Sequence, residues 1–194
     1  MARRKLSARK VRQIIVALIG IAAAATGALA LPDKPVVVPA GVTQDGLAVV
    51  KVQDGDTFVV DINGQQETVR MIGLDTPETK DPRKPVQCFG RAASNWTKDH
   101  LTGRRVKLES DPTQGERDRY DRLLAYVWRD DGLFINQTLI AEGYAHEYTY
   151  QSKPYKFQAD FQAAERTARS ESKGLWSVAA CNGDTTQADP DQSK

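Results

Sequence analysis

The chain has 194 residues, of which 40% are hydrophobic and 27% charged, which suits one ordinary domain with a real core. Its formal net charge of +2 hides an asymmetry, because residues 1–12 hold six basic side chains and no acidic ones. Residues 32–194 carry 21 basic and 25 acidic residues, a net charge of −4. This balance excludes attraction of nucleic acid by an overall positive field, so any affinity for polyanions must come from a local cluster or a bound cation.

Residues 1–31 have the pattern of an export signal. The basic stretch precedes an uncharged apolar run, Ile14 to Leu31, which contains the small-x-small cleavage pattern Ala28-Leu29-Ala30. We expect a cleaved signal peptide, and the alternative is an uncleaved membrane anchor, because a run of this length can just span a bilayer. In both cases the positive charge stays inside. We therefore expect residues 32–194 to be secreted or anchored on the outer side of the cytoplasmic membrane.

The following residues predict a linker, one domain and a tail. Residues 32–45 contain three prolines and a glycine, which favours an extended linker. We assign residues 46–180 to the folded domain. Residues 181–194 are polar and acidic, and we expect them to form a flexible tail.

Segments rich in β-branched and apolar residues alternate with turn signals in the domain. Tight turns are predicted at Asp54-Gly55 and Asn63-Gly64. The strands predicted around these turns are Leu47–Gln53, Thr57–Ile62 and Glu67–Ile72. Two later segments, Arg105–Glu109 and Leu123–Trp128, have the same character.

Apolar residues recur at helical spacing in three other segments. The predicted helices are Gln87–Leu101, Phe134–Glu142 and Pro154–Ser172, the last of which stops at Gly174. Five short strands with helices inserted late predict an α+β fold. We expect a five-stranded Greek-key β-barrel of the OB type, capped by about three helices.

The chain contains two cysteines, Cys88 and Cys181. In an exported chain an even count favours a disulfide. The bond would close a loop of 93 residues, which is worth about 4–5 kcal/mol in the chain-entropy model. Two buried thiols are the alternative.

Carboxylates follow two of the predicted strand boundaries. Asp56 lies just past the first tight turn, and Asp75 and Thr76 lie just past the third strand. Neighbouring strand ends can bring these groups together, where two carboxylates, the Thr76 carbonyl and waters would form an oxygen-only site suited to Ca²⁺. Taken singly, each segment is more often an ordinary turn or a capped loop, so it is their combination that favours a metal site. A purely structural calcium site is a further alternative.

Three charged residues supply the other parts needed to cut a phosphodiester. Glu78 follows a proline in a predicted loop and is a candidate general base, with a solvated charge or an indirect metal ligand as alternatives. Arg70 lies among apolar neighbours, which is costly unless it faces an anion such as phosphate. Arg122 leads into a strand, and standing alone it would be assigned to an ion pair with Asp118 or Asp121.

Three tyrosines, Tyr120, Tyr148 and Tyr150, lie in predicted loops. They could stack on a nucleotide or hydrogen-bond to it. Core packing is an equally good interpretation for any one of them.

The order of these motifs resembles the thermonuclease (staphylococcal nuclease-like) family. The resemblance runs from about Ala48 to Ser177. It rests on the Asp-Gly-Asp-Thr turn, on Arg70 to Glu78, on Asp118 to Tyr126 and on Gly174 to Ser177. It implies an OB-fold barrel with helices. It also implies a Ca²⁺-dependent endonuclease that hydrolyses DNA and RNA with little sequence preference and leaves 3′-phosphate ends.

The resemblance further implies roles for individual residues. Those that match the family's calcium ligands are Asp56, Asp75 and Thr76 through its carbonyl. Those that match its catalytic positions are Arg70, Glu78 as the base, and Arg122. Those that match its nucleotide-contacting tyrosines are Tyr120, Tyr148 and Tyr150. We expect the protein to be a monomer.

Three features depart from the family. Asp121 stands where a glycine often precedes the catalytic arginine, and its carboxylate could pair with Arg122 and weaken the hold on phosphate. The domain is acidic where the best-known member is basic, and the two cysteines are additions. The rival prediction is a non-catalytic nucleic-acid-binding module, because OB barrels often bind without cutting.

Overall fold

The computed structural model describes residues 43–83 and 85–189. The expected leader, residues 1–31, and most of the expected linker, residues 32–45, lie outside this part of the chain, so cleavage and export stay predictions. Within the described ranges, no helix is both long and apolar enough to cross a membrane.

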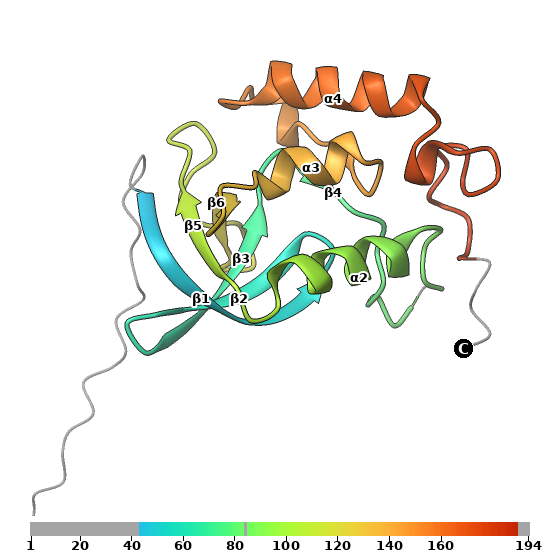
Figure 1. Ribbon diagram of the computed structural model, residues 1–194. Coiled ribbons are helices and arrows are strands. Elements are labelled where there is room, and N and C mark those ends of the chain that lie inside the picture. The colour runs from blue at the N-terminus through green and yellow to red at the C-terminus, as the bar shows by residue number, and fades with distance from the viewer. Residues whose placement is uncertain (1–42, 84, 190–194) are drawn as a thin grey trace, which may run out of the picture. The chain divides into compact units, whose positions relative to one another are not determined.

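Five strands close into a barrel (Figure 1). They are β1 (Thr43–Asp54), β2 (Thr57–Ile62), β3 (Gln65–Met71), β5 (Arg105–Glu109) and β6 (Leu123–Arg129). Their order around the barrel is β1-β2-β3-β6-β5, and β5 pairs with β1 to complete the closure. The β3–β6 pair is parallel and the other pairs are antiparallel. The predicted α+β fold with an OB-type barrel is confirmed.

Local sequence explains the first three strands. Asn63 and Gly64 both have positive φ, as a two-residue hairpin turn requires. In β3, Val69 and Met71 are buried in the core, whereas Arg70 between them is only partly buried. Because side chains alternate along a strand, the residue between two core positions must point to the opposite face. This alternation delivers Arg70 to the outside of the barrel.

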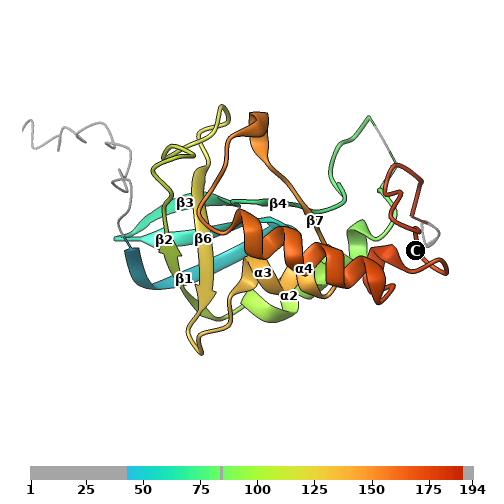
Figure 2. The ribbon, with the colours of Figure 1, turned by 90° about the horizontal axis from the view of Figure 1, so that it is seen from above.

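In the described part of the chain, two helices pack against the barrel and a third packs on one of them (Figures 1 and 2). Helix α2 (Gly90–Leu101) packs against β1, and α3 (Ile135–Ala141) lies between β6 and α4 (Gln158–Ser170). Helix α2 begins three residues later than predicted, because Gln87 forms a β-bridge with Ala188 instead of a helical turn. Each helix buries apolar side chains, which explains the helical periodicity of its sequence.

A second sheet of two short strands was not predicted. Strand β4 (Leu74–Asp75) pairs with β7 (His146–Glu147), and the Tyr148 N–H then donates to the Gly73 carbonyl at 3.0 Å. A two-residue strand leaves no alternating pattern in the sequence. This sheet places the loop of Tyr148 and of η1 (Tyr150–Ser152) beside Asp75.

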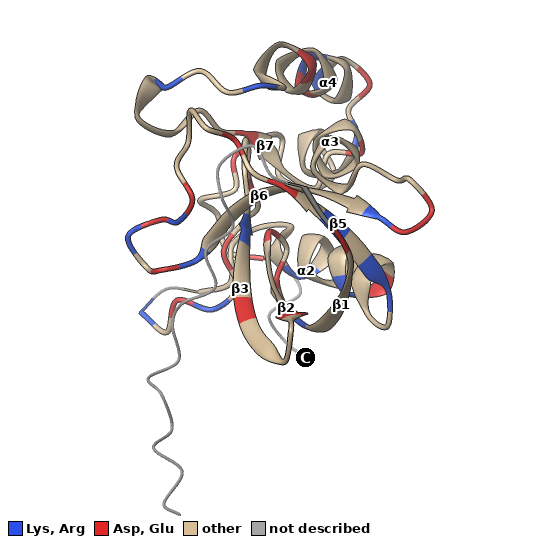
Figure 3. Ribbon diagram, turned by 90° about the vertical axis from the view of Figure 1, so that its left-hand side faces the viewer, with Lys and Arg blue, Asp and Glu red and all other residues tan. Residues whose placement is uncertain are grey.

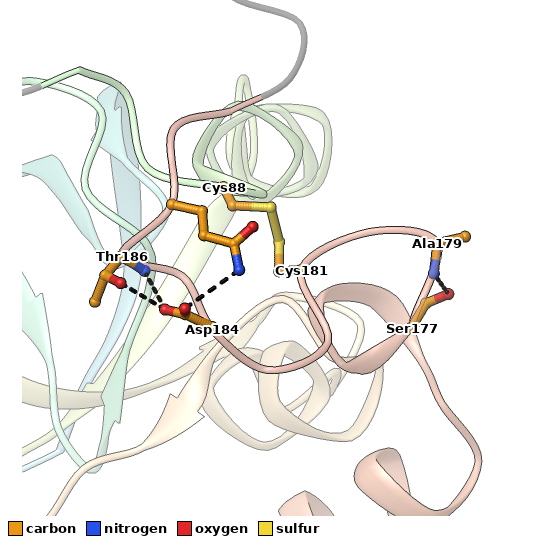
Figure 4. Close-up of a disulfide and its surroundings, with 7 residues drawn as sticks. Cys88, Ser177, Ala179, Cys181, Asp184 and Thr186 are labelled. Carbon is orange, nitrogen blue, oxygen red and sulfur yellow. Dashed lines mark hydrogen bonds between the residues drawn. A yellow bond between two sulfur atoms is a disulfide. The ribbon is translucent and has the colours of Figure 1, made fainter.

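The disulfide joins Cys88 to Cys181 across a sequence separation of 93 residues, as predicted (Figure 4). Both sulfurs belong to a small apolar cluster with Ala168 of α4 and with Leu175 and Trp176 of η2 (Gly174–Trp176). The described part of the expected flexible tail, residues 181–189, is held by backbone hydrogen bonds to residues 86–88.

Two glycines allow the backbone after α3 to cross the backbone after α4. Gly143 and Gly174 both have positive φ, and the Leu175 N–H donates to the Gly143 carbonyl at 2.9 Å. A Cβ on Gly143 would lie 2.3 Å from the Lys173 carbonyl oxygen. Side chains at this crossing would therefore push the two segments apart.

We predict that Gly143→Ala lowers the free energy of unfolding by at least about 2 kcal/mol more than the control Gly103→Ala. Gly103 also has positive φ, but nothing lies within 4 Å of a Cβ built there, so its substitution adds only the left-handed backbone cost of about 1–2 kcal/mol. Urea denaturation of both variants measures the difference. Equal losses would show that the crossing contributes nothing beyond backbone conformation.

Candidate functional site

The carboxylate of Asp56 is buried at the turn between β1 and β2. Its Oδ1 accepts a hydrogen bond from the Thr57 hydroxyl at 2.8 Å. Its Oδ2 accepts from the N–H and the hydroxyl of Thr76, at 3.1 and 3.0 Å. A Cβ on Gly55 would lie 2.7 Å from the Thr76 hydroxyl oxygen. Packing therefore explains the glycine of the Asp-Gly-Asp-Thr motif, because any larger residue at position 55 would collide with Thr76.

Arg70 lies between the two predicted metal-ligating carboxylates. Its Nη1 forms an ion pair with Asp56, and its Nη2 donates to Asp75 Oδ1 at 2.7 Å and to the Leu74 carbonyl at 3.3 Å. The Arg70 side chain is 15% exposed and that of Asp75 is 55% exposed. The carboxylates of Asp56 and Asp75 thus both pair with the Arg70 guanidinium at the rim of the barrel.

Glu78 lies in the loop after β4 and faces the same region. Its backbone N–H donates to Gln87 Oε1 at 2.7 Å, and its Oε1 accepts the Lys80 N–H at 2.5 Å. Nearby, Asp54 accepts hydrogen bonds from the Gly55 N–H and the Thr79 hydroxyl, both at 2.9 Å. Burial raises the pKa of Asp54, and the negative charge of Glu78 raises it further.

Arg122 is oriented by Asp118. The Asp118 carboxylate accepts the Arg122 N–H at 3.0 Å and its Nε–H at 2.7 Å, and Arg122 Nη2 lies 2.6 Å from it. Arg122 Nη1 reaches the Thr57 hydroxyl at 3.5 Å, and Thr57 in turn donates to Asp56. This brings the second arginine to the same place as the first.

Asp121 does not form the ion pair with Arg122 that its position made possible, because the Arg122 guanidinium pairs with Asp118. Asp121 lies 3.6 Å from Nε of Arg117, and its carbonyl accepts a hydrogen bond from Arg117 at 2.8 Å. Asp121 has positive φ, a conformation that aspartate tolerates better than most residues, and its side chain is 81% exposed. The backbone geometry that favours glycine here also turns the aspartate away from Arg122.

Two cavities meet at these residues. One of about 590 Å³ is lined by Asp56, Thr76 and Glu78, and one of about 440 Å³ is lined by Tyr148 and Tyr150. The residues that line both cavities are Arg70, Asp75, Tyr120 and Arg122.

The three tyrosines that are candidates for nucleotide contact lie on the surface, not in the core. Tyr120, Tyr148 and Tyr150 are 63%, 45% and 48% exposed. The guanidinium carbons of Arg119 and Arg122 lie 4.7 and 5.3 Å from the Tyr120 ring centroid. Exposed aromatic rings are suited to stacking on bases, and the guanidiniums beside Tyr120 are suited to phosphates.

Comparison with known proteins identifies the family. Residues 68–178 match the family described as "Staphylococcal nuclease homologue". The chain belongs to this family. It is 46% identical over 129 residues to "Thermonuclease" of Staphylococcus hyicus, a match that covers 66% of this chain and 74% of the relative. It is 41% identical over 125 residues to "Endonuclease YncB" of Bacillus subtilis (strain 168), covering 64% of this chain and 58% of the relative. The predicted resemblance is confirmed.

The family motifs contain most of the candidate site residues but not all of the residues that hold them in place through hydrogen bonds. Gln87 was not predicted as part of the site. Asp54 and Thr57 were named only as members of the Asp-Gly-Asp-Thr turn, and Asp118 only as an ion-pair alternative for Arg122. Asp54 and Thr57 belong to the Asp-Gly-Asp-Thr motif, so that motif was a usable signal. Gln87 carries no local signal, because its role depends on hydrogen bonds with Glu78 and on a β-bridge with Ala188.

We predict that Asp118→Ala lowers the free energy of unfolding at neutral pH by about 1–3 kcal/mol, because several donors lose their acceptor. Burial raises the pKa of Asp118, but hydrogen bonds from Arg122 and Tyr120 outweigh this and hold the pKa below its usual value. A lowered folded-state pKa contributes stability above the unfolded pKa of about 3.9, and that stability is lost as the pH falls through the folded-state pKa. The deficit of the variant should therefore shrink in acid.

Urea denaturation over a pH series measures this effect, with Asp121→Asn as the matched control in the same loop. The control should stay within about 0.5 kcal/mol of wild type, because its carboxylate is exposed. A deficit of Asp118→Ala that does not change with pH would contradict the assignment of these hydrogen bonds to an ionised Asp118.

Proposed function

We propose that the protein is an exported, Ca²⁺-dependent nuclease that hydrolyses DNA and RNA with little sequence preference and leaves 3′-phosphate ends. Membership in the staphylococcal nuclease homologue family and the endonuclease relative support the nuclease assignment. The observation that carries the proposal is the convergence of two carboxylates, two arginines and Glu78 around adjoining cavities. Export rests on the pattern of residues 1–31, and activity in the culture medium would test it.

The donor set fits a hard divalent cation. Among residues 43–83 and 85–189, no three His, Cys, Asp or Glu side chains gather as a metal-binding group. Asp56 and Asp75 are two carboxylates that a single guanidinium bridges. We propose that these two carboxylates, the Thr76 carbonyl and waters hold Ca²⁺. A bound divalent cation would supply Lewis-acid stabilisation of the phosphoryl oxygens.

The arginines are the proposed phosphate-binding groups. Arg70 and Arg122 line both cavities and are partly buried, so that their guanidiniums act in a medium with less solvent screening. A planar fork matches two phosphate oxygens and stabilises the charge that develops on them. Asp118 holds Arg122 in place while leaving its Nη1 near Thr57.

Glu78 is the proposed general base. It lines the larger cavity beside Asp56, and its Oε1 is fixed by the Lys80 N–H. In the proposed reaction Glu78 takes a proton from water, whose oxygen forms a new bond to phosphorus. The bond from phosphorus to the 5′-oxygen breaks, and that oxygen is protonated from solvent. The phosphate stays on the 3′ side.

The substrate preference follows from the type of contact. Exposed rings of Tyr120, Tyr148 and Tyr150 can stack on any base, and stacking is worth about 1–3 kcal/mol per base whatever the sequence. The remaining proposed contacts are to phosphate, which positions a nucleic acid without reading it. Both observations support a nuclease of low sequence preference.

We predict that EGTA abolishes hydrolysis of single-stranded DNA and RNA and that added Ca²⁺ restores it. Mass spectrometry of the products should find phosphate at their 3′ ends. Undiminished cleavage in EGTA would remove calcium from the mechanism. Binding without cleavage would favour the non-catalytic module, and calcium-dependent melting without cleavage would favour a structural metal site.

We predict that Glu78→Gln and Arg122→Ala each lower kcat by about 100-fold or more while each variant remains folded at the assay temperature, as circular dichroism checks. Matched controls are Glu171→Gln, which is exposed, and Arg129→Ala, which removes an ion-paired arginine at the other end of β6. Neither control residue lines the two cavities. Near-normal kcat in either site variant would refute the role assigned to that residue.

A further inference from the structure

The segment Cys181–Asp189, which we name the strap, is bonded to residues 86–88, just before α2. The disulfide ties its first residue to Cys88 (Figure 4). The Cys88 N–H donates to the Gln187 carbonyl, and the Asp189 N–H donates to the Val86 carbonyl, both at 2.8 Å. Between these bonds, Gln87 and Ala188 form an antiparallel bridge. Residues 86–88 are therefore held along the strap by one covalent bond and a short ladder.

The strap has its own internal supports. The Asp184 carboxylate accepts hydrogen bonds from the N–H and the hydroxyl of Thr186, at 3.0 and 2.6 Å, and from the Gln187 amide at 3.2 Å. The Gly183 N–H donates to the Leu175 carbonyl at 2.9 Å, next to the Trp176 ring. The segment turns at Asp184 and Thr186 (Figure 4), and its last residue, Asp189, hydrogen-bonds to Val86. The strap thus has a defined conformation against the domain.

Residue Gln87, which pairs with the strap, also holds the backbone of Glu78. Its side-chain Oε1 accepts the Glu78 N–H at 2.7 Å, and its own N–H donates to the Glu78 carbonyl at 3.0 Å. Both backbone polar groups of Glu78 are therefore bound by one residue. This residue lies at the centre of the strap ladder.

We propose that Gln87 is a positioning residue for Glu78 and that the strap and its disulfide hold Gln87 in place. The inference rests on the proposed function, in which Glu78 is the base. A base must lie within hydrogen-bond reach of the attacking water, and a displacement of about 1 Å can cost about 100-fold in rate. Glu78 is exposed, so the position of its side chain depends on such supports. The cysteines, which stood out as an addition to the family pattern, thereby acquire a role at the catalytic loop.

The first test is Gln87→Leu, which keeps a similar volume and removes the acceptor, with Gln162→Leu on α4 as the control. We expect kcat to fall roughly 10- to 100-fold. KM should change little, because the tyrosines and arginines proposed to bind the nucleotide lie on other segments. The control should leave both constants at wild-type values. A Gln87→Leu variant with wild-type kcat overturns the proposal.

The second test removes residues 184–194 and keeps the disulfide. Amide hydrogen exchange at Glu78 and Cys88 should accelerate. The amide of Val127 in barrel strand β6, which donates to Asn136 of α3, should keep wild-type exchange. Unchanged exchange at Glu78 overturns the role of the strap. If Val127 also exchanges faster, the truncation has loosened the whole domain, and exchange at Glu78 in Gln87→Leu decides the question.

These measurements separate the two proposals. A wild-type protein that cleaves nothing refutes the proposed nuclease, and exchange at Glu78 still reports whether Gln87 positions that residue. An active wild type with unchanged kcat and unchanged exchange in Gln87→Leu refutes only the positioning role.

Discussion

The site depends on the balance of charge between Arg70 and the two carboxylates it joins. Asp56 is buried at a turn of the barrel and Asp75 lies on a short outer strand, so one guanidinium ties two elements together. Removing either side of such a pair leaves a poorly solvated charge without compensation, which costs about 3–5 kcal/mol when the group is buried. In the proposed function the same requirement favours a metal, because a divalent cation can neutralise the carboxylates while Arg70 binds phosphate.

Local pairing also explains how an acidic domain can act on a polyanion. Segments of both signs are interspersed on β3 and in the loops beside it (Figure 3). Strand alternation places Arg70 on the outside of the barrel. The Asp118 carboxylate orients Arg122 by accepting hydrogen bonds from its backbone and its side chain. Asp121, which stands where the family often has a glycine, lies beside Arg117 instead. The positive groups therefore gather at one place without an overall positive field, and binding should weaken with salt only to the extent of these few contacts.

Most of the barrel could be predicted because its strands are long enough to show a pattern. In β3, for example, the buried Val69 and Met71 alternate with Arg70 on the opposite face. This two-residue period can be read directly from the sequence. The β4–β7 pair and the strap were not predicted, because each consists of a few residues whose pairing partner is 70 or more positions away. The start of α2 was misplaced for the same reason, since Gln87 forms a bridge with Ala188.

The amino-acid sequence by itself determined the family, the barrel and which side chains gather, because spaced motifs and alternation are local properties of the chain. Only the tertiary structure decided which partner each side chain takes. It paired Arg122 with Asp118 and not with Asp121, exposed the three tyrosines, and bound Gln87 to both Glu78 and the strap. The physical reason is that a hydrogen bond or ion pair depends on distances of about 3 Å, which are set by backbone conformation and by segments far apart in sequence.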